Sequence, residues 1–150
     1  MSFPERAVKV LVQALEREAS TTFQVNMVLR CGIVDVSAVE PFLDSSKPMV
    51  RQVAAEVVGK KGDANKVVQA ILKEQEEHVR LAMMEALGER PADYAPLYGL
   101  ASDEDDVVRD AAMRLFRRTK QNDPLFTMLF SDDEAEVNRA KRYMDAEQED

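Results

Sequence analysis

Two residues with nucleophilic or acid–base chemistry stand out because the chain holds one of each, Cys31 and His78. A triad needs a histidine that an acid orients beside a nucleophile, and no serine near His78 completes one. A zinc site draws on several cysteine and histidine ligands, so one of each is too few. The stretch "GKKGD" at 59–63 lacks the spacing and the Ser or Thr of a phosphate-binding loop. The sequence therefore predicts no catalytic residue, no metal and no cofactor.

Carboxylates gather in two short stretches, "SDEDDVV" at 102–108 and "SDDEAEV" at 131–137. Such clusters resemble metal-binding loops, but neither holds the glycine and the terminal glutamate of a twelve-residue calcium loop. They recur in phase with an internal repeat. We therefore expect them to cap helices rather than to hold a cation.

The internal repeat has a period of 29 residues, and four consecutive units share it without insertion or deletion. Its clearest mark is a valine followed, in three units of four, by an arginine. The dipeptides are Val50–Arg51, Val79–Arg80, Val108–Arg109 and Val137–Asn138. Two further columns are apolar throughout: Val39, Val68, Leu97 and Phe126, and Phe42, Ile71, Leu100 and Leu129.

Apolar positions within a unit fall at i, i+3 or i, i+4, which is the helical period, so each unit is predicted to be two helices. The first helices are expected at about 36–43, 65–72, 94–101 and 124–130, with bends at Pro41 and Pro96. Each second helix is expected to begin at the acids before the Val–Arg pair and to end near Gly59, Gly88 or "RRTKQND".

Stacked pairs bury a core that one pair of short helices cannot bury alone. The predicted fold is an all-α, right-handed solenoid of about five antiparallel helix pairs that forms a single domain over 1–150. The first unit fits the register weakly. The expected repeats span about 4–32, 33–61, 62–90, 91–119 and 120–147.

Several stretches share the order leucine, acids, Val–Arg, two residues, then alanine and a closing leucine. They are "LDSSKPMVRQVAAEVVG", "LKEQEEHVRLAMMEALG" and "LASDEDDVVRDAAMRLF". This pattern resembles the short HEAT-like repeat of the phycobilisome-lyase type over roughly 36–147. The resemblance implies that the arginines donate to acids in turns of adjacent units and form a ladder. Its donors would be Arg51, Arg80 and Arg109, and its acceptors Glu74, Asp103 and Asp132.

The ladder is expected to weaken at both ends, because Ser45 replaces an acid and Asn138 replaces an arginine. A structural role for the arginines is favoured over a direct functional one. Eight methionines raise the alternative of a hydrophobic groove. Met84 and Met113, however, share a column with Ala55 on the apolar side of the second helices, so we expect core.

Second helices line the concave face of such solenoids, and the columns expected there change from acidic in the middle to basic toward the C-terminus. Ordinary surface charge is one explanation, because Asp110, Arg114 and Arg118 are spaced to pair along one helix. The other is a polarised binding surface for a protein segment, which we call the predicted strip. Its residues are Gln52, Glu56, Leu81, Glu85, Glu89, Asp110, Arg114, Arg118, Arg139 and Tyr143.

Composition restricts the classes of partner and the compartment. The net charge of -8 repels a phosphate backbone, which argues against nucleic acid as a partner. No apolar run approaches the roughly 20 residues of a membrane helix. The start "MSFPERAVKV" does not fit a secretory signal, and a lone cysteine suits a reducing compartment. We expect a cytoplasmic protein, either a monomer or a weak homo-oligomer.

Three functions fit these observations to different degrees. The leading hypothesis is a non-enzymatic protein–protein interaction module, a scaffold or adaptor that binds a partner protein on its concave face. The resemblance implies an alternative, a phycobilin-lyase-like enzyme or enzyme subunit that acts on a tetrapyrrole-bearing antenna protein. A third possibility, binding of damaged DNA by a basic concave face, conflicts with Glu56, Glu85 and Glu89.

Overall fold

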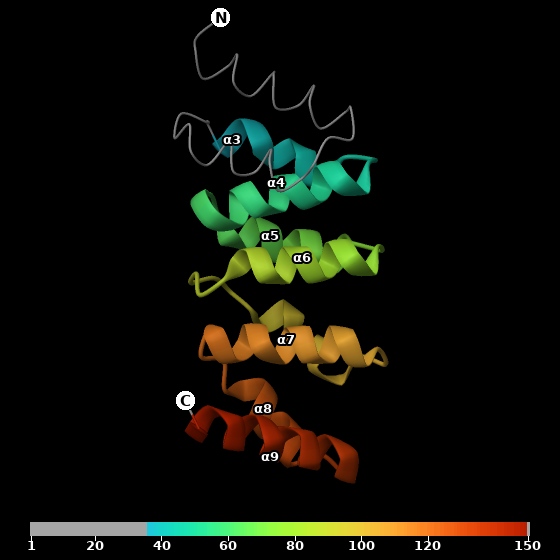
Figure 1. Ribbon diagram of the computed structural model, residues 1–150, viewed down its shortest axis with the longest axis vertical. Coiled ribbons are helices and arrows are strands. Elements are labelled where there is room, and N and C mark those ends of the chain that lie inside the picture. The colour runs from blue at the N-terminus through green and yellow to red at the C-terminus, as the bar shows by residue number, and fades with distance from the viewer. Residues whose placement is uncertain (1–35, 150) are drawn as a thin grey trace, which may run out of the picture. The chain divides into compact units, whose positions relative to one another are not determined.

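The structure is a computed structural model that describes residues 36–149 (Figure 1). The first predicted repeat, 4–32, and Cys31 lie outside the described residues. Every regular element within that range is a helix, which confirms the predicted all-α class for this part of the chain. The chain divides into two compact units, Met1–Ala92 (unit 1) and Asp93–Asp150 (unit 2).

Unit 1 is built around two second helices, α4 and α6, that lie side by side, with α5 in contact with both (Figure 1). Its elements are α3 (Val36–Val39), the 3₁₀-helix η1 (Glu40–Asp44), α4 (Pro48–Lys61), α5 (Ala64–Lys73) and α6 (Glu77–Leu87). Aliphatic side chains at helical spacing form the core. Val53, Val57, Val67, Ile71, Val79 and Leu87 are each no more than 1% exposed.

Unit 2 contains one 3₁₀-helix and three α-helices. They are η2 (Ala95–Ser102), α7 (Asp106–Arg118), α8 (Asp123–Leu129) and α9 (Glu134–Glu149). The 3₁₀-helix packs against α7 and α8, and α8 packs against α9. Tyr98 of η2 meets the Phe116 ring edge-on, with centroids 5.5 Å apart, and its hydroxyl donates to Gln121 Oε1 at 2.6 Å.

Local signals explain where the second helices begin. α4, α6 and α7 start at Pro48, Glu77 and Asp106, so successive starts are 29 residues apart, and α9 starts at Glu134. Pro48 occupies a first-turn position that needs no N–H donor. Asp105 caps α7 by accepting a hydrogen bond from the Val107 backbone N–H at 2.8 Å.

The first helices differ from their predicted form. The segment expected at 36–43 is a short α-helix followed by 3₁₀-helix η1, and the one expected at 94–101 is 3₁₀-helix η2. Pro41 and Pro96 each lie in the first two positions of a 3₁₀-helix, and Pro41 stands where the chain passes from α3 into η1; the expected bends stay a prediction. A proline fits there because the first N–H groups of a helix have no intrahelical acceptor.

Phe126 was expected in an apolar column with Val39, Val68 and Leu97, and it is 56% exposed while those three are buried. α8 begins 28 residues after η2 rather than 29. A shift of one residue turns a helix by about 100°. Pro124 and Met128 therefore face the core of unit 2, and Phe126 turns outward.

The contact between α4 and α6 depends on a glycine. A Cβ atom at Gly59 would lie 2.7 Å from the Ala86 backbone oxygen, so a larger residue there would push the helices apart. α4 ends at Lys61, two residues after Gly59 and close to the end that was expected. Arg90, after α6, donates Nη1 to the carbonyl oxygens of Gly59 and Gly62 at 3.2 and 2.6 Å, which satisfies the end of α4.

Candidate partner-binding cleft

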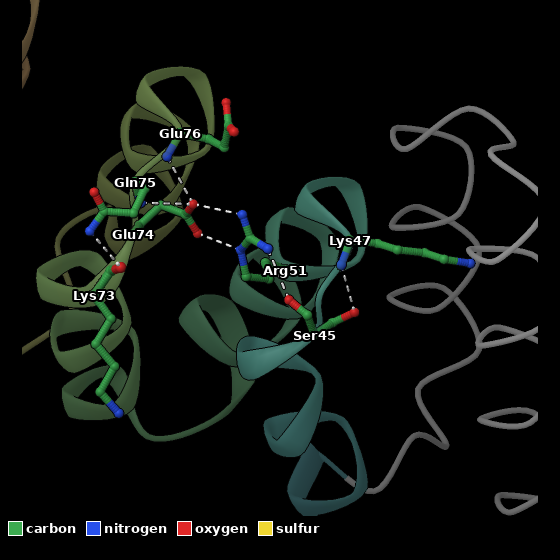
Figure 2. A network of polar contacts seen from close by, with 7 residues as sticks. All are labelled: Ser45, Lys47, Arg51, Lys73, Glu74, Gln75 and Glu76. Carbon is green, nitrogen blue, oxygen red and sulfur yellow. Dashed lines mark hydrogen bonds and ion pairs between the residues drawn. The ribbon is translucent and has the colours of Figure 1, made fainter.

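Arg51 of α4 holds the turn between α5 and α6 (Figure 2). Its Nε donates to Glu74 Oε2 at 2.7 Å and its Nη2 to Glu74 Oε1 at 2.8 Å, a two-point contact with one carboxylate. Nη1 donates to the Ser45 carbonyl oxygen at 2.9 Å.

The Glu74 side chain is 1% exposed, so its charge depends on these partners. Its Oε1 also accepts hydrogen bonds from the backbone N–H groups of Gln75 and Glu76, at 3.2 and 3.1 Å. Burial raises the pKa of Glu74, but hydrogen bonds from Arg51 and from the two backbone groups outweigh it and bring the pKa below its ordinary value. Glu74 stays ionised and anchors the start of α6.

Arg109 of α7 makes a different set of contacts. Its Nη1 donates to the carbonyl oxygens of Asp103 and Glu104, at 2.7 and 3.2 Å, and its Nη2 pairs with Asp106. Arg109 and Arg51 thus each donate to the carbonyl oxygen of the residue six positions earlier in the chain. Asp132, the expected acceptor, makes no contact with Arg109 among the described residues. The pairing of Arg80 with Asp103 would span both units and stays a prediction.

The unit 1 part of the predicted strip lies on α4, on α6 and just after α6. Gln52, Glu56 and Leu81 are partly exposed, and Glu85 and Glu89 are exposed. Burial raises the pKa of Glu56, and the hydrogen bond from Gln52 and the charge of Lys60 offset part of the rise. This part is acidic.

The unit 2 part of the strip borders a cleft of about 490 Å³ between α7 and α9. We call it the α7–α9 cleft. Its lining residues are Asp106, Arg109, Asp110, Arg139, Arg142 and Tyr143. Three of them, Asp110, Arg139 and Tyr143, belong to the predicted strip. Arg114 is exposed on α7 and Arg118 is partly exposed near its end, and neither lines the cleft.

Tyr143 bridges the two helices of the cleft. Its hydroxyl donates to Asp110 Oδ1 at 2.6 Å. Burial, followed by the hydrogen bond to Asp110 and the charge of that carboxylate, raises the pKa of Tyr143 to about 12, although Arg114 and Arg142 act in the opposite direction. Tyr143 is therefore neutral at physiological pH and keeps donating to Asp110.

Arginine donors in the cleft exceed the acceptors around them. The Nε atoms of Arg109 and Arg139 are buried and have no hydrogen-bond partner among the described residues. An unsatisfied buried donor costs about 1–3 kcal/mol. Arg139 approaches Glu136 at 4.0 Å, but that carboxylate also accepts a hydrogen bond from Ser102 at 2.7 Å. Arg142 is exposed and has no ion pair within the described part of the chain.

Sequence reasoning missed Arg142 as a member of the site. Ala55, Met84 and Met113 form an apolar column that is buried in the structure, as expected. The next position of that column, 29 residues after Met113, is Arg142. A charge at the end of an otherwise buried column was the signal for a site on α9.

A second cleft, of about 480 Å³, lies between η1 and α5 in unit 1. Its charges are largely balanced, because Glu40 and Asp44 face Lys66 and Lys73, and Lys66 pairs with Glu40 at 3.5 Å. The α7–α9 cleft differs from it by the surplus of guanidinium groups. We therefore take the α7–α9 cleft as the candidate site.

Comparison with known proteins yields a family. A family model described as HEAT repeats matches residues 36–117, which is more than half of the chain. No curated protein and no solved structure matches this chain. No helix among the described residues is long and apolar enough to cross a bilayer.

Proposed function

Because this chain belongs to the HEAT repeat family, we propose that it is a non-enzymatic scaffold or adaptor that binds a partner protein through its second helices. HEAT repeats generally mediate protein–protein interactions, since stacked helix pairs present a long continuous surface. We propose further that the chain forms one solenoid domain of five helix pairs with a 29-residue repeat and works in the cytoplasm.

Three residues of the predicted strip lie together at one cleft, which supports the proposal at the level of side chains. Asp110, Arg139 and Tyr143 come from two helices, lie 33 residues or less apart in sequence, and line one cleft in unit 2. Arginine and tyrosine are enriched among the residues that dominate binding energy at protein interfaces. The exposed charge of Arg114 lies on the same helix as Asp110 and would extend the binding surface.

Crosslinking in native lysate tests the proposal, with Arg114→Glu, Arg118→Glu as the variant. We expect the wild-type chain to give a crosslinked protein of defined identity by mass spectrometry. Loss of hot-spot arginines should reduce its yield at least about tenfold. Lys141→Glu, which changes the charge by half as much at an exposed position of α9 outside the cleft and the strip, serves as the control. Equal yields from all three proteins would refute binding through the strip.

The alternative, a phycobilin-lyase-like activity, has a direct test. Purified protein would be mixed with free bilin and the visible absorbance recorded. A shift of the bilin spectrum that persists on gel filtration would favour the lyase over the interaction module.

A further inference from the structure

We infer that the α7–α9 cleft anchors a single carboxylate of the partner protein, an inference that rests on the proposed interaction function. Three guanidinium groups and two carboxylates line the cleft. Both carboxylates are already engaged inside it, Asp106 by Arg109 and Asp110 by the Tyr143 hydroxyl. The positive charge that is left is not neutralised within the cleft.

Arg139 and Arg142 would be the principal donors to this carboxylate. They are three residues apart on α9, so both lie on one face of the helix. A guanidinium presents a planar fork of N–H groups that matches the two oxygens of a carboxylate. Glu136 lies 4.0 Å from Arg139, which leaves that guanidinium with a weak ion pair that a closer carboxylate would replace.

The charge of the surroundings limits the ligand to one carboxylate rather than an acidic run. The chain carries a net charge of -8, which repels a polyanion at long range. Asp106 and Asp110 also line the cleft, so a second negative charge would meet them at short distance. A glutamate or aspartate in an otherwise neutral segment fits these conditions, and so does the carboxylate at the end of a chain.

Nuclear magnetic resonance on the 150-residue chain tests this inference through the Nε–H signals of Arg139 and Arg142. Three peptides serve as probes: acetyl-Gly-Glu-Gly-amide, acetyl-Gly-Gly-Gly with a free carboxylate, and the neutral acetyl-Gly-Gln-Gly-amide. We expect one or both carboxylate peptides to shift the two arginine signals. Their affinity, measured by titration, should be at least about tenfold higher than that of the neutral peptide. The better carboxylate peptide identifies the source, a side chain or a chain end.

Two substitutions on α9 complete the test. Arg142→Gln removes an exposed charge that lines the cleft, and we expect it to weaken binding of the carboxylate peptide about tenfold. Lys141→Gln removes an exposed charge beside it that does not line the cleft, and should change the affinity less than about twofold. Equal binding of the neutral peptide, equal effects of the two substitutions, or no shift of the arginine signals would overturn the inference.

The outcomes separate this inference from the proposed function. If crosslinking to a partner depends on Arg114 and Arg118 but no carboxylate peptide binds, the interaction module stands and the carboxylate anchor is wrong. If the carboxylate peptides bind at the cleft but no partner depends on the strip, the anchor stands as a binding site and the interaction function loses its support.

Discussion

The pairs α4–α6 and α7–α9 each join two second helices within one unit, and they do so in different ways. α4 and α6 are in direct contact, with Gly59 against the backbone at Ala86. α7 and α9 are farther apart, and side chains such as Tyr143 span the gap and line a cleft. Two periods of the repeat after Gly59 and Ala86, the chain has Arg117 and Met144. The glycine that allows the close approach in α4 thus has no counterpart in α7.

The arginines of the closed pair and those of the open pair differ in the partners they have within their unit. In the closed pair, Arg51 donates to a buried carboxylate and to a carbonyl oxygen, so its charge is neutralised within the unit. In the open pair, Arg139 and Arg142 retain donors that face a cleft. Arg139 and Arg142 stand in the repeat columns of Leu81 and Met84 rather than in that of Arg51, so the available arginines of the open pair lie at positions that are apolar in the closed pair.

The largest expected effect comes from breaking the ion pair of the closed unit. Glu74→Ala leaves Arg51 without its carboxylate and uncaps two backbone N–H groups at the start of α6. Loss of one partner of a buried pair costs about 3–5 kcal/mol, and we expect the low end because Arg51 is partly exposed. Urea denaturation measures the loss. Glu85→Ala, at an exposed position of α6, is the control and should change stability little.

A smaller effect is expected when the closed pair is forced open. Gly59→Ala places a methyl group 2.7 Å from a backbone oxygen that cannot rotate away. Overpacking costs about 1–3 kcal/mol, and the higher helix propensity of alanine returns up to about 1 kcal/mol. We expect a net loss of about 1–2 kcal/mol in thermal denaturation. Gly99→Ala, whose Cβ would have nothing within 4 Å, should be neutral; a comparable loss there would contradict the explanation.

Removal of the bridge in the open pair should cost about 1 kcal/mol, because the Tyr143–Asp110 hydrogen bond is exposed on the protein surface. Tyr143→Phe also frees the Asp110 carboxylate, which can then compete for the arginines of the cleft and should weaken binding of acetyl-Gly-Glu-Gly-amide. In the wild type, the raised pKa of about 12 means that Tyr143 stabilises the fold below pH 10 and that this contribution is lost toward pH 12. Ultraviolet titration of tyrosinate measures that pKa.

The smallest expected effects are the changes of folding stability with pH that come from two glutamates of unit 1. The lowered pKa of Glu74 contributes stability above its ordinary value of 4.5, and this contribution disappears as the pH falls through the folded-state pKa. The raised pKa of Glu56 has the opposite sign, since it favours the fold at low pH and opposes it as the pH rises past 4.5. Glu74→Gln and Glu56→Gln should therefore change the slope of stability against pH in opposite directions between pH 3 and 6.

Local features of the sequence predicted the starts of the second helices well, because prolines, capping acids and the Val–Arg dipeptide act within one helical turn. Phe126 was placed wrongly because a shift of one residue in α8 turns the helix by about 100° and moves this side chain out of the core. The 3₁₀ form of η2 was missed as well, since the spacing of apolar residues fits both kinds of helix over a short segment.

The cleft could not be predicted from columns alone, because its size depends on how far apart two helices lie. In the closed pair that distance depends on Gly59 of α4, where a Cβ atom would meet the Ala86 backbone. The predicted strip named Asp110, Arg139 and Tyr143 by their columns. It omitted Arg109, which had been assigned to the ladder, and Arg142, which follows a buried methionine column.

The open arrangement of α9 also affects its hydrogen exchange. Among its described side chains Ala140 is the buried one, whereas seven residues of α4 are buried. Local opening requires less free energy where fewer apolar contacts are lost, so amides of α9 should exchange with deuterium sooner than those of α4. A ligand that contacts both α7 and α9 stabilises the folded state of α9 against local unfolding by mass action. Slowed exchange along α9 would then report occupancy of the cleft without any label on the ligand.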